Sequence, residues 1–116
     1  MMRPGQITPN ELEIAILKRM AVDVPALNMF IGQLHVLSRK FTGVGSYTDF
    51  RIDAESGDLP AGYLGLHALI CVPNVPSGMG AVLSTENGQP EFLEIFTYGE
   101  ELWDGLFAGF TIDSDE

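Results

Sequence analysis

Glu94 is the side chain whose surroundings most suggest chemistry. It lies in the segment 90–98 (PEFLEIFTY), whose alternation is typical of a β-strand. That alternation places three aromatic residues on the same face, namely Phe92, Phe96 and Tyr98. An acid among aromatic rings loses hydration, which raises its pKa unless a cation or hydrogen bonds compensate. Glu94 is therefore either a base or ligand-anchoring acid, or half of a buried ion pair with Arg39 or Arg51. We favour the ion pair.

A second group of polar side chains lies in the segment 46–52 (SYTDFRI), where Tyr47, Asp49 and Arg51 alternate onto one face. Most such stripes are the solvated side of an antiparallel sheet. Together with Glu94 and His67, however, these residues would line a small cleft above the sheet. A small ligand-binding domain or enzyme that uses Glu94 in this cleft is therefore our alternative hypothesis for function.

The other reactive residue types do not form a motif. His67 and Cys71 are four residues apart on one expected strand, about 13 Å at a rise of ~3.3 Å per residue, which is too far to share a metal or act as a nucleophile–base pair. His35 also stands outside any motif, and the glycines at 43–45 and 78–80 lack the spacing of phosphate-binding loops. The sequence therefore predicts no catalytic residue, no metal site and no cofactor.

A candidate partner-binding loop follows the segment 90–98. It combines one large aromatic side chain with three acids, in the order Glu100, Glu101, Trp103 and Asp104. An exposed Trp ringed by charge is typical of a binding hot spot. A Trp that caps the edge of the core fits the same pattern at least as well, so both interpretations stay open.

The clearest element that could position these residues is a helix over residues 9–22. Thr8 as N-cap and Glu11 three residues later form the pattern of a capping box. An apolar stripe follows at helical spacing, made of Leu12, Ile16, Leu17, Met20 and Ala21. Pro25 ends the helix, because the residue before a proline avoids the helical region. The segment 26–33 fits either a second short helix or a loop.

From residue 34 onward the pattern has period two and favours strands. Five or six strands are predicted, at 34–41, 46–52, 63–72, 81–85, 90–98 and 106–112. The turns at 42–45 and at Asn87-Gly88 predict two hairpins, whereas 53–62 and 73–80 are expected to be loops. The chain is thus predicted to be α+β, with the N-terminal helix packed on a mostly antiparallel sheet built from hairpins. It is expected to be a single domain over 1–116, with a flexible start at 1–7 and a frayed acidic tail at 113–116.

Charge is unevenly distributed along the 116 residues, whose net charge is −10. Residues 1–51 hold all six bases and carry +2, whereas residues 52–116 hold twelve acids, no base and −12. Such a surface repels phosphate backbones and anionic lipids, so nucleic-acid and membrane roles are disfavoured. A single cysteine and the lack of a signal-peptide pattern at the start indicate a cytoplasmic protein.

Two stretches resemble a group of small bacterial proteins of uncharacterised function. They are the hairpin SRKFTGVGSYTDF (38–50) and the segment NGQPEFLEIFTYGEELW (87–103). The matching residues are Thr42, Gly43, Gly45, Tyr47, Thr48 and Phe50, then Gly88, Leu93, Glu94, Phe96, Thr97 and Tyr98. Ser46 stands where that group has an aromatic residue, and Leu102-Trp103-Asp104 replaces its Trp-Pro ending. The resemblance implies an α+β fold with paired hairpins and transfers no mechanism.

These patterns predict a non-catalytic interaction domain, immunity-like, antitoxin-like or regulatory, that docks a basic protein partner. Complementary charge would speed this association and make it sensitive to salt. The acidic loops at 53–58, 86–91 and 100–104 are expected to face solvent or that partner. Homodimerisation is a further expectation, because a small sheet leaves an apolar face or an edge strand that needs cover.

Overall fold

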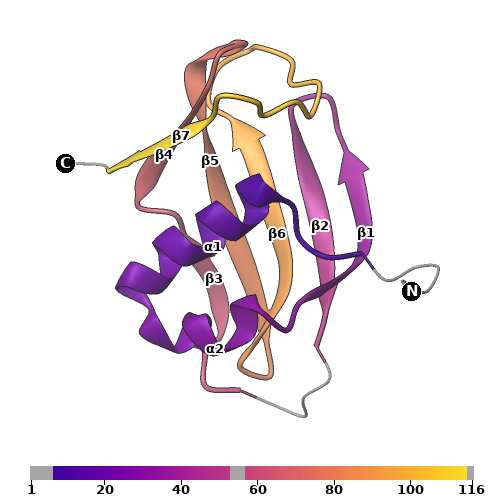
Figure 1. The fold of residues 1–116 in the computed structure, drawn as a ribbon, viewed down its shortest axis with the longest axis vertical. Helices are drawn as coiled ribbons and strands as arrows, with labels where there is room; N and C mark the ends of the chain where they lie inside the picture. The colour runs from indigo at the N-terminus through magenta and orange to yellow at the C-terminus, as the bar shows by residue number, and fades with distance from the viewer. Residues whose placement is uncertain (1–6, 53–56, 115–116) are drawn as a thin grey trace.

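Seven antiparallel strands form one sheet in the computed structural model, which describes residues 7–52 and 57–114. The helices are α1 (Glu11–Asp23) and α2 (Asn28–Ile31), with a 3-10 turn at Pro25–Leu27 between them. The strands are β1 (His35–Phe41), β2 (Gly45–Arg51), β3 (Gly62–Gly65), β4 (Ala68–Val72), β5 (Val75–Glu86), β6 (Gln89–Thr97) and β7 (Thr111–Ser114). Both helices lie on the same face of the sheet (Figure 1). The predicted α+β fold is confirmed, with a slightly larger sheet than expected.

The strand order across the sheet is β1-β2-β6-β5-β4-β7, and β3 lies beside the second half of β5. Hairpins join β1 to β2, β4 to β5 and β5 to β6. At the tip of the β5–β6 hairpin, Asn87 and Gly88 have φ angles of 55° and 73°. These left-handed angles are what an Asn-Gly hairpin turn requires, so this predicted hairpin is confirmed. Pairing of β2 with β6 then places Tyr47 opposite Glu94.

Helix α1 begins two residues later than predicted, because its N-cap is Asn10 and not Thr8. The side chain of Asn10 accepts a hydrogen bond from the backbone N–H of Glu13, and the Glu13 carboxylate accepts one from the N–H of Asn10, both at 2.8 Å. Asn is as good an N-cap as Thr, so the capping box forms two residues further along the chain than predicted. The predicted apolar stripe is confirmed, since all five of its side chains are buried.

The chain around α1 otherwise follows the expectation. Val24 is the C-cap of α1, so the helix ends before Pro25 as predicted. The segment 26–33, left open between helix and loop, is helical up to Ile31. Most of the expected flexible start lies outside the described residues, but Ile7 forms a β-bridge with Val36.

The region 63–80 differs most from the prediction. The single strand expected at 63–72 is two strands, β3 and β4, and most of the loop expected at 73–80 is the first half of β5. Proline and glycine suggested a loop, but the glycines have a packing role: a Cβ on Gly78 would lie 2.6 Å from Leu69 Cδ1 of the neighbouring strand. Glycine inside a strand often marks such a close approach. β5 is therefore long enough to pair with β4 through its first half and β3 through its second.

The last predicted strand is also displaced. β7 begins at Thr111, so the strand expected at 106–112 is wrong over most of its length, and residues 113–114 of the expected tail belong to the sheet. Gly105 and Gly109 have φ angles of 85° and 80°, which break an extended conformation on both sides of the apolar run. The segment between β6 and β7 instead folds over one end of the sheet (Figure 1).

The hydrophobic core lies between the helices and the sheet. α1 and α2 contribute buried side chains that include Leu12, Ile16 and Phe30, and the central strands contribute Leu83, Leu93 and Ile95. We call the sheet face that the helices cover the inner face and the opposite one the outer face. Alternation along β6 places Leu93 and Ile95 on the inner face and Glu94 on the outer face. Within the described residues, no helix covers the outer face (Figure 1).

Candidate functional site

An aromatic cluster surrounds Glu94 on the outer face, as the alternation predicts. We call it the outer-face cluster; it consists of Tyr47, Phe92, Glu94, Phe96 and Tyr98. The rings of Tyr47 and Phe92 have centroids 5.9 Å apart, and those of Phe96 and Tyr98 meet edge to face at 5.4 Å. The Tyr47 O–H donates a hydrogen bond of 3.0 Å to Oε2 of Glu94. The carboxylate thus stands between two aromatic pairs.

Gly80 on β5 makes room for one of these pairs. It is paired with Phe96, and a Cβ at Gly80 would lie 2.5 Å from the Tyr98 phenolic oxygen and 2.8 Å from Phe96 Cζ. The two rings therefore lie across the strand at a place where no side chain stands. This explains a glycine that sequence reasoning assigned to a loop.

Glu94 is not sealed in the core, and no described residue forms an ion pair with it. Its side chain is partly exposed, and within the described residues Oε1 of its carboxylate accepts no hydrogen bond. The hydrogen bond to Glu94 raises the pKa of the Tyr47 phenol, because deprotonation would place a second negative charge beside the carboxylate. Tyr47 therefore acts as a donor that orients Glu94.

Of the two arginines predicted as partners of Glu94, Arg39 is wrong, because its side chain points to the inner face. Its Nε and one terminal nitrogen donate hydrogen bonds of 2.8 and 2.6 Å to the two carboxylate oxygens of Glu13. Thr48 Oγ1 donates a third, of 2.7 Å, to the same carboxylate, and the N–H of Asn10 donates a fourth. We call these four residues the inner polar cluster; they join α1 to β1 and β2.

Hydrogen bonding determines the charge state of the inner polar cluster. Burial acts to raise the pKa of the Glu13 carboxyl, whose side chain is only 1% exposed. The hydrogen bonds from Arg39, Thr48 and Asn10 outweigh this effect and hold the pKa below its ordinary value. Glu13 is therefore a charged, fully paired structural acid.

Sequence reasoning missed Glu13, although the sequence carried two signals for it. Asn10 and Glu13 have the spacing of a capping box, and Glu13 lies three and four residues before two buried residues of the stripe, Ile16 and Leu17. An acid inside an apolar helical stripe needs a cation. That requirement would have predicted a buried ion pair for Glu13, without identifying Arg39 as its partner.

The other residues of the proposed cleft are not gathered around Glu94. Asp49 accepts a hydrogen bond of 2.7 Å from Ser38 Oγ. Arg51 lies opposite His35 in the register of β1 and β2. It is four residues beyond Tyr47 on β2, about 13 Å along the strand. His67 lies between β3 and β4, where its side chain is exposed and its carbonyl accepts a hydrogen bond of 2.9 Å from Arg19.

A shallow hollow adjoins the outer-face cluster. It has a volume of about 450 Å³ and is lined by Ser38, Lys40, Thr42, Tyr47, Asp49 and Phe92. Glu94 is not among these lining residues. The hollow therefore combines one lysine with one aspartate, and Glu94 lies beyond its rim.

Three of the four candidate residues in the loop at 100–104 make contacts within the fold. Trp103 is buried at the edge of the core, which is the alternative given for it above, and its indole N–H donates to the carbonyl of Leu106 at 2.8 Å. Glu101 accepts a hydrogen bond from the N–H of Ser77 at 2.7 Å, and bonding to Ser77 lowers the pKa of Glu101. Asp104 accepts from the N–H of Leu106, and Glu100 is exposed.

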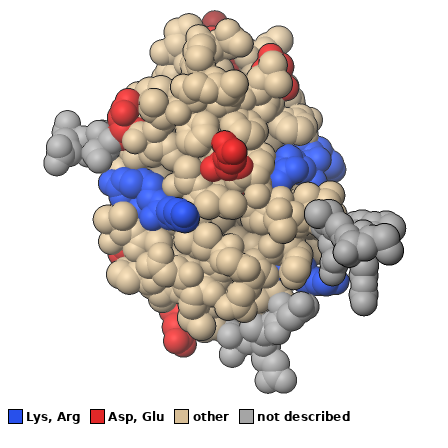
Figure 2. All heavy atoms as spheres, viewed as in Figure 1, with Lys and Arg blue, Asp and Glu red and all other residues tan. Residues whose placement is uncertain are grey.

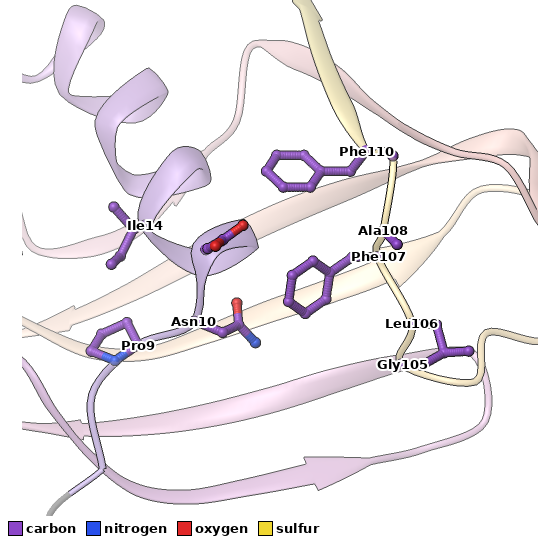
Figure 3. A pocket seen from close by; sticks show the side chains of 10 residues that line it. Pro9, Asn10, Ile14, Gly105, Leu106, Phe107, Ala108 and Phe110 are labelled. Carbon is purple, nitrogen blue, oxygen red and sulfur yellow. The ribbon is translucent and has the colours of Figure 1, made fainter.

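A larger hollow lies on the helix side, between the start of α1 and the segment 105–110. Its volume is about 740 Å³. Figure 3 shows the rings of Phe107 and Phe110 projecting from that segment toward α1, near Asn10 and Ile14. Asn10 is already used as the helix cap. The lining therefore offers apolar contact and no pair of groups suited to acid–base or nucleophilic chemistry.

Figure 2 shows the helix side, where most of the surface is neither acidic nor basic, Lys and Arg side chains lie on both flanks, and separate acidic side chains are visible, one of them near the centre. Among the described residues, no group of three or more His, Cys, Asp or Glu side chains is placed to hold a metal ion. In the same part of the chain, no helix has the length and apolar character needed to cross a membrane.

The outer-face cluster is the arrangement most suited to binding, because its aromatic rings are partly exposed and its carboxylate has an unused oxygen. Comparisons of the chain with protein-family models, with curated proteins and with solved structures found no match.

Proposed function

We propose that this chain is a non-catalytic binding protein that docks a basic protein partner on the outer face of its sheet. The observation that carries the proposal is the lack of any base in residues 52–116, which supply β3 to β7. These five strands have acids and exposed aromatic side chains on a face that no described helix covers. Such a face attracts a cationic surface and repels an acidic one.

The distribution of acids along the outer face supports a partner that is broad and basic. Glu91 accepts a hydrogen bond from Ser84, and Asp113 accepts a weak one from Cys71 at 3.5 Å. With Glu94 these acids extend from β6 to β7, on four neighbouring strands that contribute no positive charge of their own. A protein surface with several Lys or Arg side chains matches this width.

Exposed aromatic residues are a second feature, besides the acidic charge, that supports a protein partner. Tyr63 is 71% exposed on β3, and Tyr98 is 58% exposed at the end of β6. Tyrosine is enriched at the centres of protein interfaces, where its ring is buried and its hydroxyl keeps a polar contact. Burial of these rings would supply affinity, and the acids would select a basic partner and speed its association.

The alternative function, a small ligand-binding site or enzyme, is favoured by one observation, the hollow beside Tyr47. Lys40 in that hollow would attract an anionic ligand. Its support is weaker, because Glu94 does not line the hollow. An NMR titration with acetate or phosphate tests this alternative. Binding that is lost in Lys40→Gln and kept in Glu94→Gln would favour a ligand site in the hollow.

The test is affinity capture from the source cells at 50 and 500 mM NaCl, using two variants with equal charge change. Glu91→Gln/Glu94→Gln removes two acids from the outer face, and Glu11→Gln/Asp23→Asn removes two from α1. We expect the wild type and the α1 variant to retain the same basic protein at low salt, and the outer-face variant to lose most of it. The purified partner should then shift outer-face amide signals in NMR spectra.

Retention of an equal amount by the two variants would contradict docking on the outer face. Capture of acidic proteins alone would contradict the proposed chemistry of the partner. Self-association of the chain through the outer face, measured by sedimentation and lost in the outer-face variant, would show that a second copy occupies this face and would overturn the proposal.

A further inference from the structure

We infer that the outer-face cluster is an anchor site for an arginine side chain of the partner. The inference rests on the proposed function and names the chemical group that the outer face recognises. In this arrangement Glu94 accepts hydrogen bonds from the guanidinium, and the rings of Phe96 and Tyr47 contact its faces and its aliphatic stem. Tyr47 is a positioning residue as well, because its hydroxyl holds the carboxylate in place.

The first step is the unused hydrogen-bonding capacity of Glu94. A carboxylate offers about four acceptor sites, and the described contacts of Glu94 use one, through the 3.0 Å bond from Tyr47 to Oε2. Oε1 accepts no hydrogen bond from any described residue. A partly desolvated carboxylate of this kind gains most from a charged donor.

The second step is that no cation among the described residues contacts Glu94 at this position. Arg39 is bound to Glu13 on the other face of the sheet. Lys40 is paired with Tyr47 on β1, so it lies two strands from Glu94, about 9 to 10 Å at the usual strand spacing, and it forms no ion pair with Glu94. Residues 52–116 contain no base. Since no described residue of the chain supplies the cation, we expect it to come from the partner.

The third step is the aromatic surroundings, which distinguish guanidinium from ammonium. Phe92 and Phe96 flank Glu94 on β6, each about 6.6 Å away along the strand at the usual rise. A guanidinium is planar, stacks on aromatic rings and is more weakly hydrated than an ammonium, so it loses less on entering such a site. It also presents paired N–H donors that match a carboxylate. The geometry therefore favours arginine over lysine.

The test is an NMR titration of the full chain with three capped tripeptides that differ in the central residue. Ac-Gly-Arg-Gly-NH2 carries the guanidinium, the citrulline peptide has nearly the same shape without charge, and the lysine peptide has charge without the planar group. We expect the arginine peptide to shift signals of Glu94, Phe96 and Tyr47. We expect the lysine peptide to bind several-fold more weakly and the citrulline peptide to leave these signals unchanged.

Three variants make the titration specific. Glu94→Gln keeps the shape of the side chain and should weaken arginine binding about tenfold, the factor that corresponds to one lost charge-assisted hydrogen bond. Phe96→Leu should weaken it about two- to fivefold through loss of the cation–π contact. Glu11→Gln removes one negative charge from α1 and should leave the affinity unchanged.

Equal shifts from the arginine and citrulline peptides, an unchanged affinity in Glu94→Gln, or shifts confined to residues 100–104 would each overturn the anchor site. These outcomes differ from failure of the proposed function. If the partner is lost from the outer-face variant but the arginine peptide does not shift β6, the anchor fails and docking stands. If the peptide binds at Glu94 but both charge variants capture the same proteins, docking fails.

Discussion

Two adjacent residues of β2 each donate a hydroxyl to a glutamate, but on opposite faces of the sheet. Thr48 donates to Glu13 on the inner face at 2.7 Å, and Tyr47 donates to Glu94 on the outer face at 3.0 Å. On the inner face the carboxylate accepts three further hydrogen bonds, from Arg39 and Asn10. On the outer face it accepts no other from a described residue.

This difference distinguishes an acid that stabilises the fold, Glu13, from an acid that remains free to bind another molecule, Glu94. Its positive charges are few, and the guanidinium nearest the buried acid is used to keep that acid ionised inside the fold. A buried carboxylate without its cation would be strongly destabilising, whereas a partly exposed one is tolerated by solvent. We therefore expect substitutions on the inner face to change stability and those on the outer face to change binding.

The largest effect is expected for Glu13→Ala compared with Glu94→Ala. Removal of Glu13 leaves Arg39, Thr48 and the N–H of Asn10 without their acceptor. We expect a loss of about 3 kcal/mol in the free energy of unfolding, at the low end for broken buried pairs because the Arg39 side chain keeps 21% exposure. Glu94→Ala should stay within about 0.5 kcal/mol. Urea unfolding of both variants measures this, and equal losses would contradict the comparison.

A smaller effect is expected when only the hydroxyl is removed on each face. Thr48→Val deletes one hydrogen bond to a buried, charged acceptor and should cost about 1.5 kcal/mol. Tyr47→Phe keeps the ring and should leave the midpoint of urea unfolding unchanged, since its phenol is at the surface. A shift of the midpoint in Tyr47→Phe as large as that in Thr48→Val would show that the outer face also contributes to folding.

The smallest effect is expected in the pH dependence of the free energy of unfolding, where the contribution of Glu13 changes gradually at acid pH. The pKa of Glu13 is lower in the folded chain than its ordinary value. Its contribution is therefore complete above the unfolded pKa of about 4.3, and is lost as the pH falls through the folded pKa, by at most about 1.4 kcal/mol per pH unit. Unfolding of wild type and Glu13→Gln at pH 7, 5, 4 and 3 should show a difference that shrinks toward low pH. A difference between the two proteins that stays constant with pH would mean that the pKa of Glu13 is the same in the folded and unfolded chain.

The elements with strong local signals could be predicted from the sequence. The apolar stripe of α1, the Asn-Gly turn and the alternation of β6 depend on neighbours within a few residues, and all three agree with the structure. The first half of β5 could not be predicted in this way. Its glycines serve the packing of Leu69, Phe96 and Tyr98, which come from other strands, so their role is visible only after the sheet has formed.

The site could be predicted only in part, for a similar reason. Alternation correctly placed Glu94 among aromatic residues, because that relation lies within one strand. The partner of Arg39 depends on which face of β1 meets α1, and a register shift between Val36 and Ser38 decides where its side chains point. Period-two reasoning cannot locate such a shift. It therefore gave Arg39, as one of two possible partners, to Glu94 and not to Glu13.

The pairing of β2 with β6 also has a consequence for how the chain folds. The β1–β2 hairpin lies within residues 35–51, and the hairpins of β4, β5 and β6 lie within residues 68–97. These hairpins can begin to organise through contacts that are close in sequence, but joining them requires Tyr47 to meet Glu94, 47 residues away. Closing a loop of that length carries an entropic cost that local contacts do not. We therefore expect the pairing of β2 with β6 to form after the hairpins on either side of it.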